Sequence, residues 1–173
     1  MGIKKEWKAR FLGFSNFNVD QLKRCMAIDQ IQSLQPPYSM VKKGVQEEIL
    51  PFCLENEIGV VAYSPMGGGM LTGKFDKSKI AQDDWRQNNP MFDEQFLSKV
   101  LSLVEKLRPL AEKYGKTVGH IAVAWVLSNK AVTSAIVGAR TKAQTEQNIL
   151  GAEVNLSNDE LNLINDYLSE LGL

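Results

Sequence analysis

Residues 60–75, VVAYSPMGGGMLTGKF, decide the fold, because an apolar run passes here into a loop with three consecutive glycines. The run extends back to Gly59 and shows no alternation of polar and apolar residues, which is typical of a strand buried on both faces of a parallel sheet. Loops that follow strands of β/α barrels often bind phosphate, although a glycine in this position more often marks only a turn. The stretch therefore predicts a buried parallel strand that ends in a phosphate-binding loop or a plain turn.

Three other short apolar runs resemble this strand: Phe11–Phe14, Ile31–Leu34 and Val132–Val137. Helical patterns lie between and after them. They begin at Asn18, cover Val45–Asn56, and run from Asp93 to Tyr114, Thr117 to Ser128, Thr141 to Leu150 and Ser157 to the chain end. Strands that alternate with helices predict an α/β fold with right-handed parallel crossovers. Residues 66–92 show no regular pattern, and a connection of this length often acts as a lid.

The composition is that of one ordinary globular domain of 173 residues, with 20 basic and 20 acidic side chains. A net charge near zero gives no reason to expect nucleic acid or an acidic membrane as a partner. No apolar run approaches the ~18 residues of a membrane span. The N-terminal stretch MGIKKEWKAR lacks an apolar signal region, and we interpret Cys25 and Cys53 as reduced core thiols. These observations predict a cytoplasmic protein.

Polar residues gather where the predicted strands end: Ser15–Asn16, Gln35, Tyr63–Ser64 and Gly138–Arg140. The active sites of β/α barrels form at this carboxyl face. The alternative of a triphosphatase loop fails at Phe75, since that pattern needs Ser or Thr after the lysine to hold Mg²⁺. The ends of the strands are therefore the predicted ligand site.

Five stretches resemble the aldo-keto reductase family in their order and spacing: FLGFSNF, SLQPPYS, IGVVAYSPMGGGMLTGKF, TVGHIAVAWVLS and SAIVGARTKAQTEQN. The resemblance covers residues 8–173 and implies a (β/α)₈ barrel that uses NADPH to reduce carbonyl compounds. The segment GARTKAQTEQN is also similar to regulatory β-subunits of potassium channels. The implied fold is the C-terminal half of a TIM barrel, with four parallel strands, outer helices and an extra C-terminal helix, in a single NADP(H)-binding domain over residues 1–173.

The resemblance also implies the residues that bind NADP(H). Ser15, Asn16 and Gln35 would hydrogen-bond the nicotinamide carboxamide, and Tyr63 would stack on the ring. The set for the pyrophosphate is Ser64, Pro65, Met66, Gly67 and Gly69. The set for the adenosine end is Gly138, Arg140, Gln144, Gln147 and Asn148. Arg140 could pair with a ribose 2′-phosphate, and Gln147 departs from a glutamate common in the family.

The family's catalytic group of Asp, Tyr, Lys and His belongs to the first half of its barrel. This chain corresponds to the barrel from the fifth strand onward, so we expect no catalytic residue in it, and no metal site. His120 is predicted to be a surface or packing residue. Two hypotheses of function follow: a reductase fragment that reduces aldehydes or ketones only when the N-terminal half is supplied, or a non-catalytic half barrel that binds a nucleotide or a protein.

A four-strand half barrel leaves an unpaired edge on each side, which invites pairing with another chain. We therefore expect a homodimer or a complementary N-terminal half as partner, besides a small carbonyl substrate. The alternative is a monomer whose own final helix or 66–92 loop caps the edges. If Ser15, Gln35 and Tyr63 point to the barrel axis, the period of two also points Phe11, Ile31 and Val61 inward.

Overall fold

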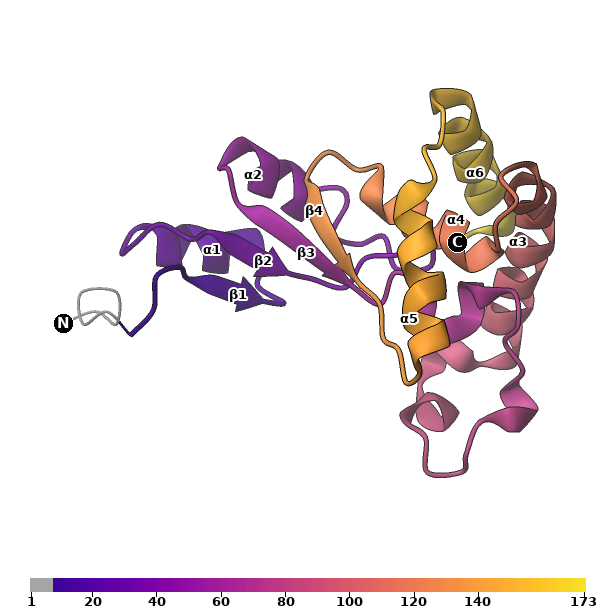
Figure 1. Cartoon of the computed structure of the whole chain (residues 1–173). Helices are drawn as coiled ribbons and strands as arrows, with labels where there is room; N and C mark the ends of the chain where they lie inside the picture. Colours follow the sequence, from indigo (N-terminus) through magenta and orange to yellow (C-terminus); the bar gives the residue numbers. More distant parts are fainter. Residues whose placement is uncertain (1–7) are drawn as a thin grey trace.

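Four short strands form one parallel sheet in the computed structural model, which describes residues 8–173 (Figure 1). They are β1 (Gly13–Ser15), β2 (Ser33–Gln35), β3 (Gly59–Tyr63) and β4 (Val132–Ile136), and they lie side by side in chain order. Every neighbouring pair is parallel. The predicted α/β half barrel is thereby confirmed. Most of the charged N-terminal stretch MGIKKEWKAR lies outside the described residues.

The first two strands begin two residues later than the apolar runs predicted. The Leu12 N–H donates to the side-chain oxygen of Gln32 at 2.7 Å, so a side chain takes the place of a backbone partner there. Ile31 precedes β2 and is buried in the core, at 1% exposed, so its predicted position on the open inner face is wrong. Phe11 lies before β1 and is 70% exposed, while Val61 is half-buried.

Within residues 8–173, six α-helices follow the predicted order, and their bounds differ from the prediction chiefly at the second. They are α1 (Val19–Met26), α2 (Ile49–Glu55), α3 (Glu94–Lys113), α4 (Val118–Leu127), α5 (Lys142–Ile149) and α6 (Asn158–Leu171). Asn18 and Ser157, where two of the predicted helices begin, each form a capping box. The α2 helix starts at Ile49 and not at Val45. Pro51 has no N–H and would break the hydrogen bonding of a helix interior, whereas it is tolerated within the first turn, where it lies here.

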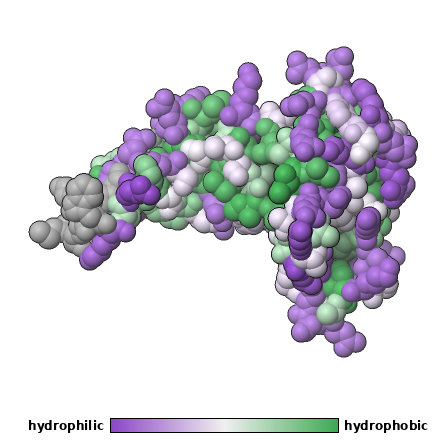
Figure 2. Space-filling model, viewed as in Figure 1, coloured by the Kyte–Doolittle hydropathy of each residue, from purple (hydrophilic) through white to green (hydrophobic). Residues whose placement is uncertain are grey.

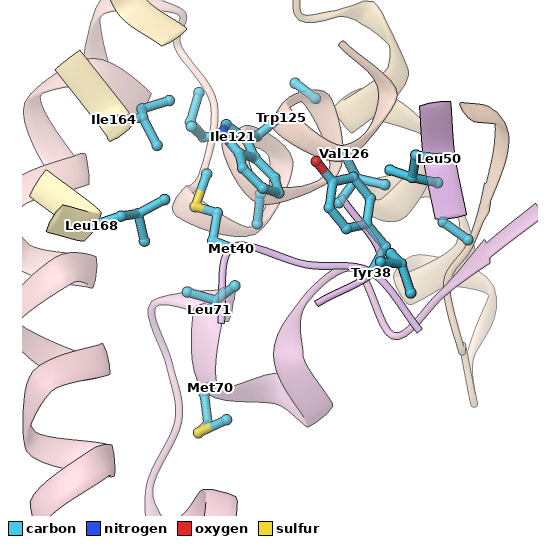
Figure 3. Packing of buried hydrophobic residues seen from close by; sticks show 14 of the residues in the cluster. Tyr38, Met40, Leu50, Met70, Leu71, Ile121, Trp125, Val126, Ile164 and Leu168 are labelled. Atoms are coloured by element: carbon cyan, nitrogen blue, oxygen red, sulfur yellow. The ribbon is translucent and has the colours of Figure 1, made fainter. Parts of the chain in front are cut away.

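Helix α4 is the centre of the core. Nine of its ten residues are buried between β4, α3 and the glycine loop, which is the segment Gly67–Thr72. Figure 3 shows Trp125 and Ile121 of α4 facing Tyr38 and Met40, with the α6 side chains nearby. The rings of Tyr38 and Trp125 lie 5.1 Å apart. Helices α3, α4 and α6 thus form a thick layer at one end of the sheet, while β1, β2 and α1 extend away from it (Figure 1).

The 66–92 connection contains no α-helix or strand, as predicted, but its own contacts fold it into short 3₁₀ turns. The first of these, η1 (Gly67–Thr72), holds the glycines. Arg86 donates to the carbonyl of Gly68 at 3.2 Å and pairs with Asp84 at 2.7 Å, so an ion pair ties this part of the connection to η1. The rings of Trp85 and Phe92 are perpendicular, with their centroids 5.5 Å apart. Within residues 8–173, no helix combines the length and apolar character needed to cross a bilayer.

Candidate functional site

The carboxyl ends of β1, β2 and β3 bring four of the predicted residues into one hydrogen-bonded cluster. The Ser15 hydroxyl and the Asn16 N–H both donate to the backbone carbonyl of Gln35, at 3.0 and 3.2 Å. The Tyr63 hydroxyl donates to the side-chain carbonyl of Asn16 at 3.1 Å. Ser15, Asn16 and Gln35 are exposed. This polar group therefore faces solvent where a ligand could reach it.

Two residues directly after strands adopt the left-handed backbone conformation without being glycine. Asn16 follows β1 with φ 61°, and Ser64 follows β3 with φ 57°. Such conformations cost roughly 1–3 kcal/mol each and concentrate at functional sites. At both positions the chain leaves its strand at the carboxyl edge of the sheet. The backbone geometry therefore marks the same place as the polar side chains do.

Close packing leaves no room for a side chain at two glycines of the glycine loop. An added Cβ at Gly67 would lie 2.7 Å from Cγ2 of Val41, and one at Gly68 would lie 2.8 Å from Phe92. Gly69 has more room, and its φ of 102° is the reason for glycine there. The side chain of Met66 packs toward Gly119, and Pro65 is buried, so the backbone of this loop is the part available to a ligand.

The loop after β4 is held against α5 by two of the predicted adenosine contacts. The side-chain oxygen of Gln144 accepts from the Arg140 N–H at 2.6 Å. Asn148 donates to the carbonyl of Gly138 at 3.1 Å. These two amides therefore shape the loop, whereas Arg140 and Gln147 are exposed. A Cβ at Gly138 would meet nothing within 4 Å, so this face of the loop is open.

Charged residues of the 66–92 connection interact with Arg140 in the loop after β4, a feature that the sequence interpretation missed. Arg86 lowers the pKa of Asp84 to about 2, and Arg140 acts in the same direction. The Arg140 guanidinium forms no ion pair within 4.0 Å in the described part of the chain. The sequence does carry a signal for this ion pair. Asp84 and Arg86 have opposite charges and lie two positions apart in a loop with little other structure.

The remaining reactive residue types lie away from this edge. His120 is 3% exposed, and its Nδ1 accepts from the Thr117 N–H at 3.1 Å. Burial raises the pKa of the Cys53 thiol to about 11, so the thiol stays protonated at neutral pH. Residues 8–173 hold no group of three His, Cys, Asp or Glu side chains that could share a metal ion.

Residues 2–168 match the profile of the aldo/keto reductase family. The chain belongs to this family. Among curated proteins, aldo-keto reductase YhdN of Bacillus subtilis is 35% identical over 80% of this chain and 43% of its own length. The NADH-specific methylglyoxal reductase of Escherichia coli is 30% identical over 90% and 48%. A probable voltage-gated potassium channel subunit beta of Arabidopsis thaliana is 31% identical over 88% and 49%.

The glycerol dehydrogenase AKR11B4 of Gluconobacter oxydans has a similar solved structure, with a TM-score of 0.89 and 30% identity. The likeness covers 97% of this chain and 51% of that one. The chain therefore spans about half the length of the relatives that it matches.

The groups at the carboxyl edge fit a nicotinamide carboxamide, which needs both a donor and an acceptor. Because Tyr63 donates to the Asn16 oxygen, the amide NH₂ of Asn16 remains as a donor. Because the Ser15 proton goes to the Gln35 carbonyl, the Ser15 oxygen keeps acceptor lone pairs. The exposed side chain of Gln35 offers both functions. The residue types and their arrangement therefore suit this end of a dinucleotide.

Proposed function

We propose that this chain binds NADP(H) along the carboxyl edge of its sheet, as the cofactor-binding half of a reductase for aldehydes or ketones. The observation that carries the proposal is the cluster of Ser15, Asn16, Gln35 and Tyr63, beside the left-handed turns at Asn16 and Ser64. The family supports a nicotinamide cofactor, and one relative is named a methylglyoxal reductase. The two thiols, both unpaired, support a cytoplasmic location.

Each part of the edge would have a distinct task. Ser15, Asn16 and Gln35 would fix the carboxamide, and the ring of Tyr63 would support one face of the nicotinamide. The backbone from Ser64 to Gly69 would follow the pyrophosphate. When bound, the cofactor would supply the hydride, and the chain's own residues would orient it. Reduction would require a complementary N-terminal half with its proton donor.

A non-catalytic role is the second candidate, and one observation favours it. The Tyr63 hydroxyl has an amide as its hydrogen-bond partner, and the chain's one histidine is buried in α4. The described edge thus offers no paired acid and base. Under this alternative the half barrel binds a nucleotide or a protein and transfers no hydride.

Arg140 gives the sharpest test of the cofactor. A charge-assisted contact with phosphate contributes about 1.5–3 kcal/mol. Arg140→Glu should therefore weaken NADP(H) by about tenfold or more, while NAD(H), which has no 2′-phosphate, changes little. Isothermal titration calorimetry with both dinucleotides measures this difference.

Lys130→Glu is the matched control, because Lys130 is exposed at the opposite end of β4 and should leave both affinities unchanged. Equal affinity of the unmodified chain for NADP(H) and NAD(H), unaltered by Arg140→Glu, would remove the assignment of Arg140. Failure of both dinucleotides to bind would remove the cofactor-binding proposal itself.

A further inference from the structure

The 66–92 connection is packed directly against the glycine loop. Cζ of Phe92 lies 2.8 Å from the position that a Cβ would take at Gly68, and Arg86 donates to the carbonyl of that glycine at 3.2 Å. Lys77 donates to the Phe92 carbonyl at 2.7 Å. Because these contacts hold the connection beside the loop, its exposed side chains have defined positions at the carboxyl edge of the sheet.

This packing leaves the indole of Trp85 exposed. Its Cη2 lies 3.4 Å from the Cβ position of Gly68, yet 62% of the residue is exposed. Among residues 66–92, all of which the structure describes, no other large hydrophobic side chain is exposed. Figure 2 shows a mostly hydrophilic surface over this part of the molecule, at the lower right. A lone indole in polar surroundings makes no apolar protein interface, but it suits a small ligand that carries a flat ring and charged groups.

The indole lies between the two places where the proposed dinucleotide would present phosphate. The glycine loop beside it would follow the pyrophosphate. On the other side, Asp84 is the neighbour of Trp85 in the chain and is close enough to Arg140 for that charge to help lower the pKa of its carboxyl. Arg140 would hold the 2′-phosphate. The adenosine joins these two phosphate groups, so Trp85 lies beside the path of the adenosine.

We propose that Trp85 stacks on the adenine ring of the dinucleotide and thereby holds the base at the carboxyl edge. The inference rests on the proposed function. The amides at the start of α5 have other tasks, because Gln144 accepts from the Arg140 N–H and Asn148 donates to the Gly138 carbonyl. Stacking needs no amide, since every base offers a π-face to an aromatic side chain.

The charges beside the indole give this contact a distinct signature. Arg86 donates to both carboxylate oxygens of Asp84, at 2.9 and 2.7 Å, so the two side chains next to Trp85 neutralise each other. Trp85 should therefore contribute equally to the binding of NADP(H) and of NAD(H), which have the same base. Arg140, by contrast, should affect only the dinucleotide that carries a 2′-phosphate.

Isothermal titration calorimetry of the 173-residue chain with NADPH and with NADH tests the proposal. Trp85→Ala should weaken both by a similar factor, about 5- to 100-fold. Trp85→Phe keeps an aromatic ring and should retain most of the affinity, whereas Trp85→Leu keeps only apolar bulk and should behave as Trp85→Ala does. Ile28→Ala is the matched control, because Ile28 is 88% exposed but lies between α1 and β2, at the opposite end of the strands. Circular dichroism verifies that the variants fold.

Tryptophan fluorescence supplies a readout that a merely structural role would not move. The probe is adenosine 2′,5′-bisphosphate, which has the base and the 2′-phosphate but no nicotinamide. Stacking on the exposed indole should quench the emission of the unmodified chain, while Trp125, at 4% exposed, should not respond. Trp85→Phe should still bind the probe and should lose the quenching.

Four outcomes would overturn the inference. They are unchanged affinities in Trp85→Ala, weakening of NADPH alone, equal weakening in Trp85→Phe and Trp85→Ala, and quenching that persists in Trp85→Phe. If the unmodified chain binds NADPH in a manner that depends on Arg140 and Trp85→Ala changes nothing, the inference fails and the proposed function stands. If the unmodified chain binds neither dinucleotide, the proposed function fails and the inference fails with it.

Discussion

His120 is buried in α4 and interacts with the start of that helix and with the backbone of α5. Nδ1 accepts from the Thr117 N–H at the start of α4, and the ring hydrogen-bonds the backbone of Gln147 in α5. Only a neutral ring can accept at Nδ1. Burial lowers the pKa of His120, and Lys116 adds to the effect, while Gln147 and Glu153 oppose it. The packing role predicted for this residue is confirmed, and it is linked to the helix that carries Gln144 and Asn148.

The single histidine gives a pH dependence with a defined sign. Its pKa in the folded chain lies below the ordinary 6.5, so below that pH the unfolded chain binds the proton more readily. The contribution to stability is complete above about pH 6.5 and declines as the pH falls toward the folded-state pKa. Urea unfolding at about pH 8 and about pH 5.5 should show this loss.

His120→Gln separates this effect from other titrations. Glutamine at the third helical position can still accept from the Thr117 N–H, but it carries no proton in this range. The variant should be less stable by about 1–3 kcal/mol at pH 8 through the lost link to Gln147, and its stability should vary less with pH. Parallel pH profiles for the two proteins would contradict the role given to His120.

At the scale of elements, one carboxylate fastens α6 to α3. Glu160 accepts from Lys113 and from the Tyr114 hydroxyl, each at 2.7 Å, and from the Ser157 N–H at 2.7 Å. These partners lower the pKa of Glu160 to about 2, with Lys113 and Tyr114 contributing most. The residue thus completes a capping box and a link between helices at the same time.

Glu160→Gln should lower the free energy of unfolding by about 1.5–3 kcal/mol near neutral pH, as expected for hydrogen bonds to a charged group. The folded-state pKa is depressed, so this contribution is present above about 4.5 and is lost as the pH falls toward about 2. Thermal melts across this range should therefore show the two proteins converging in acid. Glu170→Gln is the control on the same helix, because its pair with Lys106 is exposed and should contribute little.

Sequence patterns located the long elements and missed features that arise from individual contacts. Strand β3 and the caps at Asn18 and Ser157 were predictable, because apolar runs and capping boxes are local signals. The starts of β1 and β2 were not, because the Gln32 side chain replaces a backbone partner. The four clustered edge residues were predictable from their place at the ends of apolar runs, but their individual roles followed only from a family resemblance. No local signal marks Ser64 as left-handed.

At the scale of the whole molecule, binding groups and catalytic groups are separable. The carboxyl edge of a half barrel can hold polar contacts from four strands, because each strand delivers its own end to the same face. Proton transfer to a carbonyl oxygen has a stricter requirement, since the donor must be paired with groups that tune its acidity and lie within hydrogen-bond reach of the substrate. In the described chain, Tyr63 has only the Asn16 amide beside its hydroxyl.

The 173-residue chain alone should therefore show no carbonyl reductase activity, even if it binds the cofactor. General acid catalysis contributes about 10²–10⁴-fold, and stabilisation of the developing oxyanion contributes about 10²–10³-fold more. NADPH oxidation with para-nitrobenzaldehyde should not exceed the rate without protein, while the full-length Bacillus subtilis relative serves as the positive control. Turnover by the purified chain that Tyr63→Phe abolishes would contradict this prediction, because it would make Tyr63 a proton donor in place of a surface for the nicotinamide ring.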